Sequence, residues 1–307
     1  MSLTIVGSVA FDAIQTPYGQ TDKIIGGAGT YISLAASYFV KRQNIVAVVG
    51  GDFPAEYITI LEKHGANTKG LQIKKEEKTF FWSGKYHDNM NSRETLITEL
   101  NVLEHFDPII PTDYQDTEYL MLGNLSPIVQ RKVIERLNKR PKLIVMDTMN
   151  FWMDILMDEL KKTIALVDVL TINEEEAQQL SGKMNIVEAA EAVIAMGPST
   201  VIIKKGEHGA ILFGKDGQMF ATPAMPLRNV FDPTGAGDSF AGGFVGYLAS
   251  KDETSFATMK KATVAGSVIA SFCVEKFGTE RLVNLPSTDI DARINAFINL
   301  SQFGSAL

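Results

Sequence analysis

Cysteine and histidine are scarce in this chain. Its 307 residues include one cysteine, Cys273, and four histidines. A single cysteine excludes an intrachain disulfide and fits a reducing compartment, so we expect a cytoplasmic location. Cys273 stands in an apolar stretch and is expected to be a buried hydrophobic residue rather than a nucleophile. No His, Cys or Asp cluster has the spacing of zinc ligands or of a nucleophilic triad, so neither chemistry is indicated.

Long apolar runs and an excess of basic charge are also missing. No apolar run approaches the roughly 18 residues that a membrane-spanning helix needs, and residues 1–10 lack the basic region of a signal peptide. The formal net charge of −7 and the pI near 5.2 argue against a general nucleic-acid binder, which normally carries a basic face. We therefore expect neither a membrane nor a nucleic-acid partner.

The order of apolar segments predicts the fold class. From residue 117 onward, short apolar strands alternate with amphipathic helices, which predicts an α/β fold with a mostly parallel sheet and helices on both faces. Residues 71–100 differ. Thr79–Tyr86 is aromatic, Glu94–Leu100 alternates, and a turn separates them, so these two segments predict a β-hairpin.

The most informative stretch is 229–244, which reads Asn-Val-Phe-Asp-Pro-Thr-Gly-Ala-Gly-Asp-Ser-Phe-Ala-Gly-Gly-Phe. Apolar spacing predicts a helix from Asp238 onward. The backbone N–H groups of Gly235, Ala236 and Gly237 would then lie at a helix N-terminus, where anions bind. Asp238 is either the cap of this helix or a base beside a bound phosphate.

This stretch resembles the signature of the ribokinase-like (PfkB-type) carbohydrate and nucleoside kinases. The matching residues are Asp232, Thr234, Gly235, Ala236, Gly237, Asp238, Phe240 and Gly243. The resemblance implies a ribokinase-like α/β fold. It divides the chain into a large domain (1–12, 26–70 and 101–307) and a small β-sheet lid (13–25 and 71–100). It also implies ATP-dependent phosphorylation of a hydroxyl, with Asp238 as general base and the 235–237 backbone as anion hole.

The resemblance also assigns an acceptor site. It implies contacts from Asp12, Gly26, Gly27, Asn124 and Asp238, although Asp12 and Asn124 are equally well explained as turn residues. A carboxylate such as Asp12 suits this task because it accepts hydrogen bonds from two hydroxyls. The family often has Asn where this chain has Tyr31, which removes an amide and adds an aromatic face.

A nucleotide and metal site follows from the same resemblance. It implies nucleotide contacts from Asn173, Glu176, Lys204, Gly206, Gly209, Gly235 and Gly237. Glu176 would hold Mg²⁺ through water, in keeping with the oxygen ligands that Mg²⁺ prefers. Asp232 and Thr234 would lie beside a monovalent cation such as K⁺. The run from Asn173 to Glu176 is alternatively an ordinary helix N-terminus.

The sequence therefore predicts an ATP-dependent kinase that acts on a sugar or sugar-like small molecule. A nucleoside kinase of the same family and a non-catalytic sugar- or nucleotide-sensing relative are the alternatives. Tyr31 and the aromatic residues Phe81 and Trp82 favour a bulkier ring or a nucleoside. A dinucleotide-binding oxidoreductase finds little support, because no Gly-rich fingerprint follows the first strand. The exposed β-sheet lid further predicts a homodimer.

Overall fold

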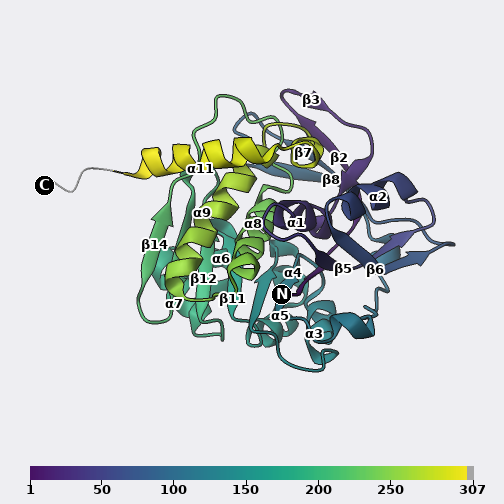
Figure 1. Cartoon of the computed structure of the whole chain (residues 1–307), viewed down its shortest axis with the longest axis horizontal. Coiled ribbons are helices and arrows are strands. Elements are labelled where there is room, and N and C mark those ends of the chain that lie inside the picture. The colour runs from purple at the N-terminus through teal and green to yellow at the C-terminus, as the bar shows by residue number, and fades with distance from the viewer. Residues whose placement is uncertain (303–307) are drawn as a thin grey trace, which may run out of the picture.

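The computed structural model describes residues 1–302, so the last five residues of the predicted large domain lie outside it. A nine-stranded sheet runs through the molecule in the order β14-β13-β12-β11-β10-β9-β1-β5-β6 (Figure 1). The strands from β6 to β12 along this order are parallel, and β13 and β14 are antiparallel. The bounds are β1 (Leu3–Val6), β5 (Gln43–Gly50), β6 (Ala66–Lys74), β9 (Tyr119–Leu122), β10 (Leu143–Asp147), β11 (Val169–Asn173), β12 (Thr200–Lys204), β13 (Ala210–Gly214) and β14 (Met219–Thr222).

Helices cover both faces of the large sheet, as the alternating pattern predicts. One face carries α1 (Ala28–Ala36), α8 (Ala236–Lys251) and α9 (Phe256–Cys273), and the other carries α3 (Pro127–Glu135), α5 (Met157–Ile164), α6 (Glu174–Ser181) and α7 (Ile186–Ile194). The remaining helices are α2 (Ala55–Lys63), α4 (Asn150–Ile155), α10 (Glu280–Val283) and α11 (Ser287–Ser301). Buried Val, Ile and Leu side chains fill both interfaces, so the sheet is apolar on both sides.

Helix α8 packs very closely against its neighbours, and this explains two of its glycines. A Cβ on Gly242 would lie 2.4 Å from the carbonyl oxygen of Ile32 in α1. A Cβ on Gly243 would lie 3.0 Å from the Cα of Gly266 in α9. The Gly-Gly pair of the motif therefore serves helix packing and holds the start of α8 against the sheet.

A second, smaller sheet has the order β3-β2-β7-β8, with β4 paired to β2. Its strands are β2 (Ala10–Thr16), β3 (Gly19–Gln20), β4 (Ile24–Gly26), β7 (Phe81–Tyr86) and β8 (Arg93–Glu99). Strands β7 and β8 are antiparallel neighbours, so the predicted hairpin is confirmed. We call this small sheet the lid. In Figure 1 it lies beside the end of the large sheet at which the β-strands meet α1 and α8.

Sheet membership differs from the predicted division at both junctions. Residues 71–74, predicted to be in the lid, pair with β5 in the large sheet. Conversely, Ala10–Asp12 pairs with β4 and β7 in the small sheet. Both differences arise because β6 lies wholly in the large sheet and β2 wholly in the small sheet, so the change of sheet falls in the segments between strands. The predicted division into two domains stays a prediction.

Within residues 1–302, no helix is long and apolar enough to cross a membrane.

Candidate active site

The N-terminus of α8 forms a loop of free backbone N–H groups. Gly235 is the N-cap with φ 74°, and a Cβ there would lie 2.3 Å from the ring of Tyr31, which lies beneath it. Within the described residues, the N–H groups of Gly235, Gly237 and Asp238 have no acceptor. The N–H of Ala236 is different, because it donates to Pro233. The free N–H groups of this loop are therefore those of Gly235, Gly237 and Asp238, and the predicted anion hole formed by the 235–237 backbone stays a prediction.

Asp238 lies in the first turn of α8 but does not cap it. Gly235 is the cap residue, and no described residue donates a hydrogen bond to the Asp238 carboxylate. Burial and the negative charge of Asp147 raise its pKa to about 7, and the cations Lys204 and Arg93 act in the opposite direction. Because nothing else occupies this carboxylate and it titrates near neutral pH, it suits a general base.

Lys204 at the end of β12 is the cation closest to this loop. Its Nζ lies 3.0 Å from Asp147 Oδ2, and a Cβ on Gly237 would lie 3.1 Å from the same Nζ. The charges of Asp147, Glu176 and Asp238 raise the pKa of Lys204, although burial opposes them. Lys204 is therefore a fixed positive charge beside the free N–H groups at the start of α8.

Glu176 has a structural role and a charged neighbourhood at the same time. Asn173 and Glu176 form a capping box at the start of α6, with two hydrogen bonds of 2.8 Å. Burial raises the pKa of Glu176 to about 7, with Asp147 adding to the effect and Lys204 opposing it. The capping box confirms that this motif starts a helix, and the predicted role of Glu176 beside Mg²⁺ stays a prediction.

These side chains fit Mg²⁺ when it is bound through water and phosphate. Asp147 and Glu176 supply two neighbouring carboxylates, and the described residues hold no cluster of three or more His, Cys, Asp or Glu that would ligate a metal directly. Mg²⁺ typically keeps several waters and binds one or two carboxylates together with substrate phosphates. The donor set suits that mode of binding.

Asp12 on β2 forms the other side of the site with Gly26 and Gly27. The Gly27 N–H donates to Asp12 Oδ2 at 3.4 Å, and a Cβ on Gly26 would lie 1.9 Å from the same oxygen. Asp12 is 4% exposed. Burial, with Asp232 and Asp238 as further causes, raises its pKa to about 7. The two glycines therefore leave room for a carboxylate that faces the same interior as Asp238.

The lid brings Tyr86 and Trp82 to this interior and places the exposed residue Arg93 at its edge. The Thr234 hydroxyl donates to the Tyr86 hydroxyl at 3.2 Å, which ties β7 to the loop before α8. Arg93 stands opposite Tyr86 on β8, and its charge lowers the pKa values of Asp12, Glu176 and Asp238. Trp82 stands opposite Asp12 on β7, and its ring lies against Gly84.

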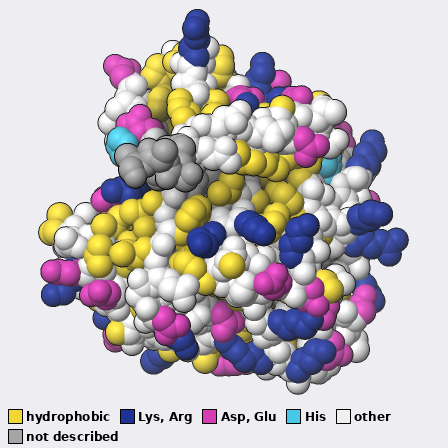
Figure 2. Space-filling model, turned by 60° about the vertical axis from the view of Figure 1, so that its left-hand side comes forward, with side chains coloured by type: hydrophobic (Ala, Val, Ile, Leu, Met, Phe, Trp, Pro, Cys, Tyr) yellow, Lys and Arg dark blue, Asp and Glu magenta, His cyan; other side chains and the backbone are white. Residues whose placement is uncertain are grey.

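A cavity of about 530 Å³ opens beside α8. It is lined by Lys204, Gly206, Gly209, Ala236 and Gly237 at one part, and by apolar residues of α9 and of the 224–230 segment at another. Figure 2 shows hydrophobic side chains bordering a hollow on one face of the molecule, with Lys and Arg side chains below it. A cavity of this size with one cationic part suits an elongated ligand that carries phosphates.

Two predicted positions have other partners. The Asn124 side-chain amide accepts a hydrogen bond from Trp152 Nε1 at 2.8 Å and donates one to Met149 Sδ. These contacts give no support to the predicted role of Asn124 in binding the substrate hydroxyl. Asp232 is fully buried and accepts from the N–H groups of Thr234 (2.8 Å) and Gly278 (2.7 Å). Asp232 thus holds the loop before α8 against the segment after α9.

Sequence reasoning did not include Asp147, Tyr86 or Arg93 among the site residues. Asp147 ends a parallel strand, and this position was the available signal, because ligands gather at the carboxyl ends of such strands. Tyr86 and Arg93 lie on the lid, and only the pairing of β7 with β8 and the docking of the lid bring them to Asp238.

A model of the pfkB family carbohydrate kinases matches residues 2–285. The chain belongs to this family. The chain is 28% identical over 251 residues to the cytidine kinase of Thermococcus kodakarensis. The matched region covers 80% of this chain and 87% of that protein. The solved nucleoside kinase of Methanocaldococcus jannaschii has a TM-score of 0.76 at 22% identity, covering 96% of this chain and 98% of that one. A putative ribokinase II from E. coli, solved in complex with ATP and Mg²⁺, has a TM-score of 0.79 at 18% identity, covering 96% and 99%.

Proposed function

We propose that this pfkB-family kinase transfers the terminal phosphoryl group of ATP to a hydroxyl of a nucleoside. The observation that carries the acceptor class is the pairing of Asp12 with Trp82 on neighbouring lid strands. In parallel pairing, directly opposed residues point to the same face of a sheet. A carboxylate for ribose hydroxyls thus lies next to an indole ring on which a base can stack. The cytidine kinase and nucleoside kinase among the relatives support this acceptor class.

Trp82 is held in a fixed orientation. Its ring packs on Gly84, where a Cβ would lie 2.2 Å from the ring carbons, and its Nε1 donates to Thr95 at 3.3 Å. The Arg93 guanidinium lies 5.7 Å from the ring centre. A ring that is already immobilised loses little entropy when it stacks on a ligand. Such a platform favours a planar base over a simple sugar.

The chemistry that we propose uses groups on both sides of the interior. The Asp238 carboxylate accepts the proton of the attacking hydroxyl, which Asp12 holds in place. The free N–H groups of Gly235 and Gly237, together with Lys204 and Arg93, stabilise negative charge on the transferring phosphoryl group. Phosphoryl transfer depends mainly on positioning and electrostatics, so this set is sufficient. The covering lid excludes water that would otherwise hydrolyse ATP.

Cations complete this proposal. Asp147 and Glu176 would hold Mg²⁺ through water, and the ion would neutralise charge on the nucleotide phosphates. A monovalent cation beside Asp232 and Thr234 remains our prediction, supported by the complete burial of the Asp232 carboxylate without a side-chain cation partner among the described residues. The cytoplasmic location and the lack of nucleic-acid partners also stay predictions.

A substrate panel tests the acceptor class. We expect purified protein with MgATP to release ADP with at least one nucleoside, with a kcat/KM that exceeds that for ribose, fructose or inositol. Trp82→Ala should raise the KM for that nucleoside by about 5- to 100-fold, because stacking of a base on an aromatic ring contributes about 1–3 kcal/mol. Trp82→Phe is the matched control and should retain most of the affinity. A monosaccharide as the best substrate, with a KM unchanged in Trp82→Ala, would contradict the proposal.

We also propose that the lid pairs with the lid of a second copy. All seven residues of β8 are exposed, and β8 ends the small sheet with only β7 as a neighbour among the described strands. Leu96 and Ile97 on this strand are 42% and 46% exposed, and Leu100 just after it is 38% exposed. An exposed edge strand with apolar side chains is a template for pairing.

Light scattering coupled to gel filtration tests this pairing. We expect a dimer for the wild-type protein and a monomer for the double variant Leu96→Glu, Ile97→Glu. Met219→Glu is the matched control, because Met219 is 60% exposed on β14, an edge strand of the other sheet. A wild-type monomer, or a double variant that remains dimeric, would show that β8 is not the interface.

A further inference from the structure

The turn between β7 and β8 reaches beyond the lid. This turn comprises residues 87–92 and is tightly organised, because Asn89 Oδ1 accepts from the N–H groups of Asn91 (3.2 Å) and Ser92 (3.1 Å). Met90 at its tip has φ 55°. A non-glycine residue in this left-handed region stores strain, and such strain is concentrated at functional positions. The strain at Met90 therefore marks the tip of this turn as a candidate functional segment.

The tip lines the 530 Å³ cavity that the nucleotide would occupy. Asn89, Met90 and Asn91 are among its lining residues, opposite the loop from Gly206 to Gly209. Asn91 Nδ2 donates to Glu207 Oε1 at 3.3 Å, and a Cβ on Gly206 would lie 3.3 Å from Asn91 Oδ1. The lid thus contributes a wall to a cavity that otherwise belongs to the large sheet and its helices.

We propose that Met90 and Asn91 form part of the ATP-binding site, so that one lid hairpin binds the nucleotide at its tip and the acceptor along its strands. This inference rests on the proposed kinase function and adds a nucleotide-binding segment to it. Trp82 and Tyr86 lie on β7, and the tip follows directly after this strand. A ligand that fixes either part of the hairpin therefore restricts the other part as well.

Shared use of one element has a thermodynamic consequence. The first ligand to bind orders the hairpin and bears the entropic cost of doing so. The second ligand then binds to a hairpin that is already ordered, so each ligand tightens the binding of the other. Such coupling is reciprocal and amounts to the same factor in both directions. The kinase is then expected to bind ATP tightly only when the lid is in place, which limits ATP hydrolysis without acceptor.

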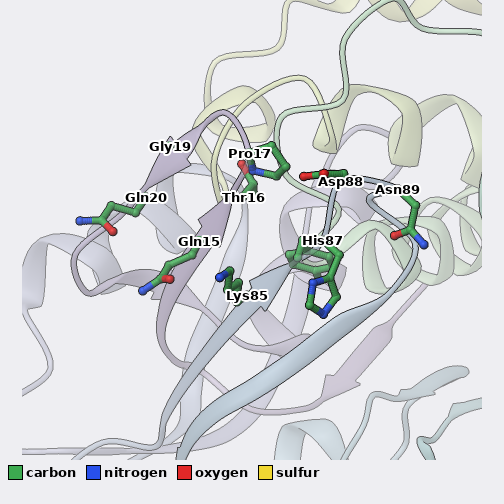
Figure 3. A pocket seen from close by; sticks show the side chains of 10 residues that line it. Gln15, Thr16, Pro17, Gly19, Gln20, Lys85, His87, Asp88 and Asn89 are labelled. Atoms are coloured by element: carbon green, nitrogen blue, oxygen red, sulfur yellow. The ribbon is translucent and has the colours of Figure 1, made fainter.

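The neighbouring residue Asp88 provides a control from the same turn. It lines a different cavity, of about 740 Å³, between this turn and the β2–β3 hairpin. Figure 3 shows Asp88 close to Pro17 on that side, whereas the Asn89 side chain points away from Gln15 and Lys85. Asp88 is absent from the lining of the nucleotide cavity. A substitution there changes the turn without changing the proposed contact.

Calorimetry with the non-hydrolysable analogue AMP-PNP and Mg²⁺ tests the proposal on the full chain. We expect Met90→Gly, which keeps the positive φ accessible, to raise the Kd of AMP-PNP about tenfold, because it removes a half-buried thioether side chain that lines the cavity. Asn91→Ala should raise it about threefold or more through the loss of one hydrogen bond. Asp88→Ala should leave it unchanged, and thermal melts should show that all three variants fold.

The acceptor gives a second, independent readout. The Kd of the nucleoside with the highest turnover in the panel is measured with and without AMP-PNP. In the wild type, AMP-PNP should lower this Kd; in Met90→Gly, the ratio of the two Kd values should fall toward one. Wild-type AMP-PNP affinity in both tip variants would overturn the inference and leave the kinase function standing. Weaker nucleotide binding in these variants, with no nucleoside turned over in the panel, would support the nucleotide segment and reject the proposed acceptor class.

Discussion

Asp238→Asn should lower kcat by about 10²- to 10⁴-fold, because the variant removes the group that accepts the proton of the attacking hydroxyl. The side chain keeps its size and its place in the first turn of α8, where no described hydrogen bond depends on the carboxylate. The KM values should change little, because binding uses the backbone N–H groups and Asp12. Steady-state ADP release with the panel nucleoside measures both constants. Turnover near that of the wild type would reject Asp238 as the base.

The same variant should be more stable than the wild type, which separates loss of chemistry from loss of fold. The folded pKa of Asp238 is raised from 3.8 to about 7, so folding favours the protonated carboxyl. Its contribution to stability is present below pH 4 and is lost as the pH rises through 7. At pH 8 the ionised, buried carboxylate lowers the free energy of unfolding, and asparagine carries no such charge. Asp238→Asn should therefore raise the Tm by at least about 2 °C.

The wild-type pH profile provides a check that needs no mutation. With an essential base of pKa about 7, kcat/KM should fall about tenfold per pH unit well below neutrality. Asp12 and Glu176 also have pKa values raised to about 7, and their protonation can only steepen this fall. The range from about pH 5 to about pH 8 brackets this pKa, so a kcat/KM that is constant over it would contradict the assignment of Asp238 as the base.

Gly235→Ala should damage both catalysis and folding. A left-handed φ of 74° costs an alanine about 1–2 kcal/mol, and the new Cβ would lie 2.3 Å from the Tyr31 ring. Relief of this overlap moves the loop and its N–H groups, and the loss of one such donor typically lowers kcat by about 10²- to 10³-fold. Overpacking adds about 1–3 kcal/mol of destabilisation. Urea unfolding and ADP release measure the two effects.

Gly182→Ala is the matched control for this substitution. Gly182 ends α6 with φ 70°, nearly the same conformation, but a Cβ there meets nothing within 4 Å. This variant should lose only the conformational term of about 1–2 kcal/mol and keep the kcat of the wild type. Equal loss of stability in both variants would show that the contact between Gly235 and Tyr31 is unimportant.

Local patterns in the sequence predicted most of the large sheet. The alternation of strands and helices from residue 117 onward is confirmed by β9, β10, β11 and β12 and by the helices between them, and α3 begins at Pro127, a residue suited to the first helical position. Ser126 is the N-cap residue of α3, yet its side chain makes no capping hydrogen bond. These elements could be predicted because apolar spacing and turn residues act over a few positions along the chain.

The parts of the site that depend on distant contacts could not be predicted in this way. The alternating segment was predicted as Glu94–Leu100, which begins after Arg93, so Arg93 was missed. The packing role of Gly242 and Gly243 could not be predicted, because their partners in α1 and α9 are far away in sequence. The free and occupied N–H groups of the 235–238 loop likewise depend on the φ of one glycine and on the carbonyl of Pro233.

The burial of Asp12 has a consequence for the speed of the whole cycle. Because only 4% of this residue is exposed, we expect the proposed acceptor to reach it, and the phosphorylated product to leave it, only when the small sheet moves away. Each turnover then includes one lifting and one lowering of that sheet, and such motions typically take microseconds to milliseconds. If this motion is slower than the chemical step, the maximal rate should depend on solvent viscosity, which slows the motion, and not on the leaving group of the phosphoryl donor.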